Sequence, residues 1–155
     1  MGRARASISV PGRAAEAEAL WYDPHRWQAW VDGFGHVAEL SKEWPAEGRL
    51  VWDSLPGGRG RVMEIVRSYE PRTGQTLAVE DERLLGTRKV TFVPGPDEVT
   101  IELELDYELK GGNLLTPIVD ALVVRRELAG SLRRTLERFA RERRAEGEWD
   151  ALASR

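Results

Sequence analysis

Residues 98–109 read EVTIELELDYEL and form the most regular pattern in the chain. Apolar or aromatic side chains occupy every second position from Val99 to Leu109, and threonine or acidic side chains occupy the positions between them. Because successive side chains of a strand point to opposite faces, this pattern predicts a strand with one dry and one wet face. A sheet built from such strands must bury its dry face against another layer.

The following stretch, GGNLLTPIVDALVVRRELAGSLRRTLERFARERR (111–144), predicts the helix that covers this face. Thr116 fits the N-cap and Pro117 the first helical position, and the helix is expected to run to about Arg144. Its length is then about 42 Å at ~1.5 Å per residue. Residues 146–155 are expected to form a loosely ordered tail.

The two halves of this helix differ in composition. The second half carries a single apolar stripe at spacings of three and four, formed by Leu128, Leu132, Leu136 and Phe139. The first half, 114–124, is apolar almost all the way round, which one buried face does not explain. We expect it to border a cavity, and the alternatives are burial on all sides or a homodimer interface.

The rest of the chain predicts one domain over 1–155 with mixed elements. ASISVPG reads as a strand, and a short helix follows that must end at Asp23-Pro24, since the residue before proline avoids the helical region. A second short helix places Trp27 and Trp30 on one face. Further strands are expected at 36–42, 49–54, 60–70, TLAVEDERL and TRKVTFV, separated by glycine- and proline-rich turns.

Composition narrows the classes of function. The chain has 155 residues, a net charge of -3 and no cysteine, so disulfides, thiol nucleophiles and cysteine-ligated metals are excluded. The negative charge gives no reason to expect a nucleic-acid partner. No apolar run approaches the ~20 residues of a membrane span, and no signal peptide is recognisable, so a cytoplasmic location is expected.

Two motifs carry a resemblance to a known family. AEAEALWYDPHRWQAWVDGF (15–34) and GGNLLTPIVDALVVRRELAGSLRRTLERF (111–139) resemble patterns of the START-like, helix-grip (SRPBCC) superfamily, within it the polyketide cyclase/dehydrase and lipid-transport group. The resemblance implies an α+β helix-grip fold, in which about six or seven antiparallel strands curve around the C-terminal helix. It also implies an apolar cavity between sheet and helix, on a scaffold shared by carriers, cyclases, hydrolases and regulators.

Strand alternation and this resemblance select the side chains expected to line the cavity. Residues 60–70 allow two registers, of which one turns Val62, Glu64 and Val66 inward and the other turns Met63, Ile65, Arg67 and Tyr69 inward. We favour the second because it buries more apolar area. The expected lining is Trp27, Trp30, Phe34, Trp52, Met63, Ile65, Leu77, Val79, Phe92, Ile101, Leu103, Leu105, Tyr107, Leu115, Ile118, Val119 and Leu122.

Candidates for chemistry are the polar side chains expected on the same face, namely His36, Arg67, Tyr69, Asp81 and Tyr107. Ring closure of a polyketide-like chain needs a base, which an Asp or His can supply, and a donor for the enolate oxygen, which an Arg or Tyr can supply. The structural alternative for each is a charge at a strand edge or a core tyrosine with a paired hydroxyl. The two histidines fit no metal motif, and we expect neither a metal nor a cofactor.

Three functions remain open at this point. The first is a carrier or binding protein for a hydrophobic small molecule such as a lipid, a polyketide or an isoprenoid or quinone. The second is a cyclase, aromatase or dehydratase of the polyketide type, and the third is a regulatory module that dimerises through its apolar helix end.

Overall fold

The alternating stretch 98–109 forms strand β7 (Glu98–Leu109) in the computed structural model, which describes residues 1–111 and 118–155. Val99, Ile101 and Leu103 are buried, while the glutamates between them reach solvent, so the predicted dry and wet faces are confirmed. β7 lies between β1 (Gly2–Pro11) and β6 (Leu84–Pro94), antiparallel to both.

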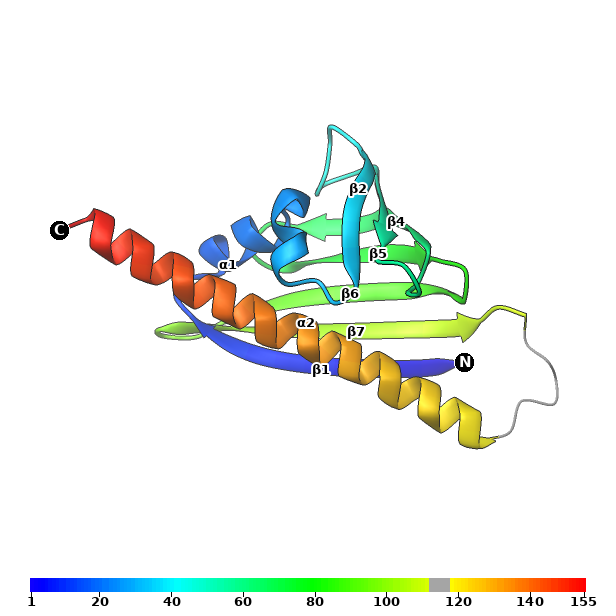
Figure 1. The fold of residues 1–155 in the computed structure, drawn as a ribbon. Coiled ribbons are helices and arrows are strands. Elements are labelled where there is room, and N and C mark those ends of the chain that lie inside the picture. Colours follow the sequence, from blue (N-terminus) through cyan, green and yellow to red (C-terminus); the bar gives the residue numbers. More distant parts are fainter. Residues whose placement is uncertain (112–117) are drawn as a thin grey trace.

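Seven antiparallel strands form one curved sheet in the order β1-β7-β6-β5-β4-β3-β2 (Figure 1). The remaining elements are α1 (Ala14–Trp21), η1 (Pro24–Ala29), β2 (Phe34–Leu40), β3 (Arg49–Ser54), β4 (Arg61–Glu70), β5 (Gly74–Glu80) and α2 (Ile118–Ala153). Together they make the helix-grip fold, with two short helices after the first strand, so the predicted fold class is confirmed.

The short helices α1 and η1 follow the local signals in the sequence. Glu16 accepts a hydrogen bond from the Arg13 backbone N–H (3.0 Å) at the start of α1, and Asp23 accepts one from the His25 N–H (3.1 Å) at the start of η1. α1 ends just before the Asp23-Pro24 step, as predicted. Both helices lie on the concave side of the sheet, near the C-terminal half of α2 (Figure 1).

Helix α2 runs obliquely along β1 and covers the concave face (Figure 1). Leu136, Phe139 and Ala140 are buried in the core, which confirms the apolar stripe of its second half. The helix continues to Ala153, beyond the predicted end near Arg144, so most of the segment expected to be a loose tail is helical.

Asp32, in the turn before β2, fastens this turn to α2. Its backbone N–H donates to Thr135 Oγ1 (3.0 Å), and its carboxylate accepts from Ser131 Oγ (2.7 Å) and Arg134 Nη2 (3.0 Å). Burial alone would raise the pKa of Asp32, but these hydrogen bonds and the charges of Arg134 and Arg138 outweigh burial and lower it.

The register favoured for 60–70 is wrong for its first half. Val62 and Glu64 are fully buried on the concave face, whereas Met63 and Ile65 lie on the outer face. A bulge after Val66 then shifts the pairing of β4 with β5 and turns Tyr69 inward against the core. Arg67 is exposed, so it does not face the space under the helix.

Candidate ligand site

The apolar core under α2 consists of two separate clusters. The larger one surrounds Trp21, Trp30 and Phe139, where α1, η1 and the C-terminal half of α2 meet. The smaller one consists of Leu84, Leu105 and Tyr107, against which the partly buried Val124, Leu128 and Leu132 of α2 pack.

Arg88 on β6 lies at the boundary between the two clusters. Its cross-strand neighbours are Leu77, which belongs to the larger cluster, and Leu105, which belongs to the smaller one. Its Nη1 lies 2.7 Å from Oε1 of Glu64 on β4, and its guanidinium stands over the ring of Trp27 at 5.7 Å from the centroid. An ion pair therefore interrupts the apolar concave face.

The Glu64 carboxylate is fully buried, yet neither of its oxygens accepts a hydrogen bond from the described residues, because the contact with Arg88 is close but poorly aligned for one. Trp30 Nε1 and Trp52 Nε1 are likewise buried without an acceptor there. A buried polar atom left unpaired costs about 1–3 kcal/mol, so native interiors rarely keep several of them. Glu64 and Trp52 belong to the neighbouring strands β4 and β3, and Tyr22 Oη, Gln75 Oε1 and Arg143 Nε are also buried without a partner among the described residues.

Aromatic rings form a wall beside the ion pair. The ring of Phe34 lies 5.1 Å from that of Trp52 and 6.0 Å from that of Trp27. Trp52 also carries the guanidinium of Arg59 over its ring at 5.6 Å, and Arg59 Nε contacts Asp81 at 2.6 Å. Large rigid rings with a few polar groups are the usual lining of a small-molecule site.

Solvent reaches this interior at Arg88. Its side chain is 14% exposed although it points to the concave face from a central strand. On α2, Leu122 and Val123 are each 48% exposed, so the apolar first half of the helix is not closed off by protein at these positions.

Most of the predicted lining points to this face. Eleven of the predicted residues are buried in the two clusters: Trp27, Trp30, Phe34, Trp52, Leu77, Val79, Phe92, Ile101, Leu103, Leu105 and Tyr107. Met63 and Ile65 are on the opposite face, for the reason given above. Leu122 is 48% exposed and belongs to neither cluster, and Leu115 and the side chains of Ile118 and Val119 lie outside the described part of the chain.

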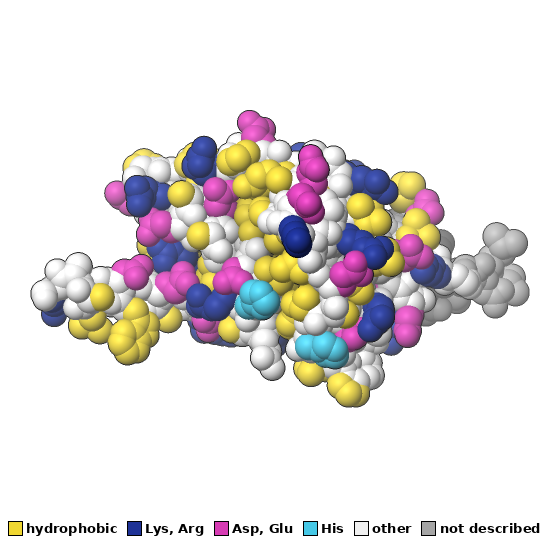
Figure 2. Space-filling model, turned by 90° about the horizontal axis from the view of Figure 1, so that it is seen from above, with side chains coloured by type: hydrophobic (Ala, Val, Ile, Leu, Met, Phe, Trp, Pro, Cys, Tyr) yellow, Lys and Arg dark blue, Asp and Glu magenta, His cyan; other side chains and the backbone are white. Residues whose placement is uncertain are grey.

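The predicted catalytic residues are dispersed rather than brought together. His36 is 71% exposed and contacts Asp53 at the sheet edge (3.1 Å), and both histidines lie on the surface in Figure 2. Asp81 is buried but accepts from the Arg83 and Leu84 N–H groups as well as from Arg59, which makes it a turn-forming residue.

The two predicted tyrosines sit in separate parts of the core. Tyr69 packs edge-on against Tyr22 at 5.5 Å, in the larger cluster. Burial raises the pKa of the Tyr69 hydroxyl and of the Tyr22 hydroxyl, so these two groups stay protonated at neutral pH. Tyr107 belongs to the smaller cluster, where its ring faces Gly2.

Arg88 was not among the residues predicted for the site, and Glu64 faces inward only in the register that was not favoured. The signal for Glu64 is its place inside VMEIV (62–66), where a carboxylate interrupts an apolar run. The register was chosen by the apolar area that it buries, and this criterion places a carboxylate on the wet face. The inward and outward residues of the first half of β4 were therefore exchanged in the prediction.

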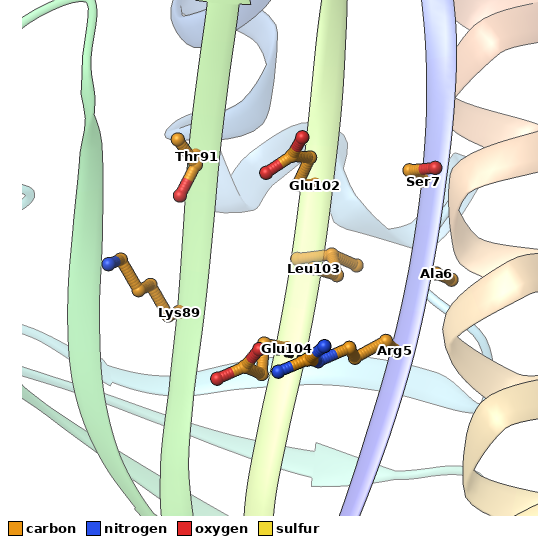
Figure 3. A pocket seen from close by; sticks show the side chains of 8 residues that line it. All are labelled: Arg5, Ala6, Ser7, Lys89, Thr91, Glu102, Leu103 and Glu104. Carbon is orange, nitrogen blue, oxygen red and sulfur yellow. Dashed lines mark ion pairs between the residues drawn. The ribbon is translucent and has the colours of Figure 1, made fainter.

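A different hollow lies on the outer face of the sheet. It has a volume of about 560 Å³ and is lined by Arg5, Ser7, Lys89, Thr91, Glu102 and Glu104, with Ala6 and Leu103 behind them (Figure 3). Arg5 Nε pairs with Glu104 at 2.7 Å, as the dashed line there marks. This hollow is open and charged, unlike the apolar cavity expected under α2.

Neither a metal-binding cluster nor a membrane span is found in the described residues. Within 1–111 and 118–155, no three His, Asp or Glu side chains are grouped so that they could hold a metal ion. None of the helices in the described part of the chain combines the length and apolarity needed to cross a membrane.

Comparison with solved structures shows the same fold in several bacterial proteins. TTHA0849 from Thermus thermophilus superposes with a TM-score of 0.78 at 16% identity, over 94% of this chain and 99% of that one. A START superfamily protein from Mycobacterium smegmatis has a TM-score of 0.74 at 13% identity, over 92% and 97%. DynU16, from the dynemicin biosynthetic locus, has a TM-score of 0.62 at 20% identity, over 90% of this chain and 46% of that one.

Comparison of sequences gives the family. A search of curated proteins found no match to this chain. The family model for polyketide cyclase/dehydrase and lipid transport matches residues 1–143, which span β1 to the second half of α2 and include Glu64 and Arg88. The chain therefore belongs to the polyketide cyclase/dehydrase and lipid transport family.

Proposed function

We propose that the chain is a carrier or binding protein that holds a hydrophobic small molecule between the concave face of the sheet and α2. Family membership and fold suggest hydrophobic-ligand binding or a polyketide-cyclase-like function. The ligand class that fits is a lipid, a polyketide or an isoprenoid or quinone.

The observation that carries this proposal is the set of unpaired polar atoms beside the aromatic wall. Three such atoms, Glu64 Oε2, Trp52 Nε1 and Trp30 Nε1, lie among apolar and aromatic side chains. A protein selected only for a closed core would fill these positions with apolar side chains, since an ion pair in a core is often neutral or unfavourable for stability. A ligand with an apolar body and a polar end satisfies both kinds of lining.

The test is binding of 1-naphthol, which has an apolar aromatic body and one hydroxyl group, measured by equilibrium dialysis. Val79 lies on the concave face opposite Glu64, and its neighbour Ala78 lies on the outer face of the same strand. Val79→Phe is expected to weaken binding about tenfold or more by filling the site, while Ala78→Phe binds like the wild type.

Circular dichroism of both variants verifies folding. Mass spectrometry of small molecules extracted from natively purified protein supplies a measurement that needs no variant. A wild-type protein that neither binds 1-naphthol nor carries an extractable apolar molecule would contradict the proposal.

A second function is favoured by the chemistry of the same pair. In an aldol-type ring closure, the Glu64 carboxylate would take a proton from carbon next to a carbonyl, and the carbanion would attack a second carbonyl of the same chain. The new alkoxide would then take the proton back, with the Arg88 guanidinium stabilising the negative oxygen. Glu64→Gln would abolish turnover of a poly-β-ketone while retaining its binding, which separates this enzyme from a carrier.

A further inference from the structure

We infer that the site selects neutral ligands that carry a hydroxyl group, an alcohol, phenol or enol, and that Glu64 accepts the hydrogen bond of this hydroxyl. The inference rests on the proposed function and narrows its ligand class. It excludes ligands whose polar end is a carboxylate, such as free fatty acids.

The oxygens of Glu64 are acceptors in need of a donor. Both carboxylate oxygens are buried from solvent, and while Oε1 is held in the ion pair with Arg88, Oε2 has no partner among the described residues. An ionised carboxylate has room for about four hydrogen bonds and is costly to bury without them. The group that completes the site must therefore bring a donor, which a carboxylate, an ether or a ketone lacks.

The net charge of the ion pair disfavours an anionic ligand. Arg88 lies 2.7 Å from Glu64, so the pair has no net charge to attract an anion. A ligand carboxylate that reached Glu64 would place two negative charges side by side in a dry interior, where their repulsion is large. Charge at the site therefore favours a neutral molecule.

The aromatic wall supplies a donor of its own. Trp52 lies on the same face of β3 as Leu50, the cross-strand partner of Glu64, and is thus the diagonal neighbour of Glu64 within reach of a bound group. Trp52 Nε1 donates to no described residue. A hydroxyl oxygen can donate to Glu64 and accept from an indole N–H at once, whereas an amine offers mainly donors and a ketone only an acceptor.

The experiment compares three probes of the same apolar body: naphthalene, 1-naphthol and 1-naphthoate. Dissociation constants are measured by equilibrium dialysis at pH 7, where 1-naphthol is neutral and 1-naphthoate is an anion. The expected order places 1-naphthol roughly tenfold or more tighter than either of the others, the effect of one hydrogen bond to a charged acceptor.

Variants locate the selectivity at Glu64. The double substitution Glu64→Leu with Arg88→Leu removes both charges together, which cores tolerate, and should bring 1-naphthol and naphthalene to equal affinity. The matched control is Glu80→Gln, which changes the exposed glutamate paired with Lys110 on the outer side and should keep the preference.

The outcomes of this experiment distinguish failure of the proposed ligand binding from failure of the proposed hydroxyl selectivity. If no probe binds, the proposed function fails. If naphthalene binds but 1-naphthoate matches 1-naphthol, or if the preference survives in the double variant, only the hydroxyl selectivity is overturned.

Discussion

At the scale of single residues, the Glu64–Arg88 pair makes stability depend on both partners together. Glu64→Leu alone leaves the guanidinium of Arg88 without its counter-charge in a mostly buried place. Removing one member of a buried pair typically costs about 3–5 kcal/mol, and we expect the low end because Arg88 retains some solvent contact. Urea denaturation of the single variant measures this loss.

The double variant Glu64→Leu with Arg88→Leu is the control for this effect. It should be more stable than Glu64→Leu alone, because no charge is left unpaired. Additive losses from the two substitutions would show that the pair is not coupled.

Asp32 gives a pH dependence with a defined sign. Its pKa is lowered in the folded protein, so its contribution to stability is full above the unfolded pKa near ~3.9 and declines as pH falls through the folded pKa. Asp32→Asn should cost about 1–2 kcal/mol at pH 7 and less at pH 3, the loss being limited by the exposure of Arg134. Thermal unfolding of both proteins between pH 3 and pH 7 tests this, and a pH-independent difference would contradict it.

At the scale of elements, β4 is the strand whose predicted register differs from the one in the structure. Single substitutions can test which register is correct. Val62 is fully buried on the concave face and its neighbour Met63 lies on the outer face. Val62→Ala should lower the free energy of unfolding by about 1–3 kcal/mol, whereas Met63→Ala should lower it by less than about 1 kcal/mol. The reverse ranking in urea denaturation would restore the register predicted from apolar area.

The physical reasons for success and failure differ between elements. β7 was predicted correctly because its face to the core is uniformly apolar, so the alternation has one solution. In β4, the charged residue Glu64 occupies the inner face, and a bulge shifts the phase before Tyr69. Neither the pairing of Glu64 with a distant Arg88 nor a bulge can be read from local periodicity.

For the candidate site, the sequence predicted the apolar lining but not the polar residues. The apolar lining from β5, β6 and β7 followed from alternation, because those strands keep regular pairing throughout. The catalytic candidates did not come together, since a polar residue near a strand end is more often used for turns and edges, as Asp81 and His36 are here. The proposed function rests on Glu64, the charge that breaks the apolar pattern of β4.

At the scale of the whole molecule, the C-terminal end of α2 projects beyond the sheet (Figures 1 and 2). Its residues after Gly147 are exposed, with Trp149 at 72%. Removal of residues 148–155 should therefore change the free energy of unfolding by less than about 0.5 kcal/mol, measured in urea. Removal from residue 143 onward should cost more, because Arg143 is buried and contacts Glu16 at 2.8 Å.

The pairing of β1 with β7 also determines the order in which the fold can be completed. In the part of the chain that the structure describes, residues 2–11 pair with residues 98–109, so an edge of the sheet joins segments about a hundred positions apart. During synthesis, β1 leaves the ribosome before its partner β7 has been made. Its backbone hydrogen-bonding groups therefore remain unpaired until β2 to β7 have been synthesised. Arg3 and Arg5 protect β1 from aggregation during this time, because charge on an unpaired strand discourages pairing with other chains.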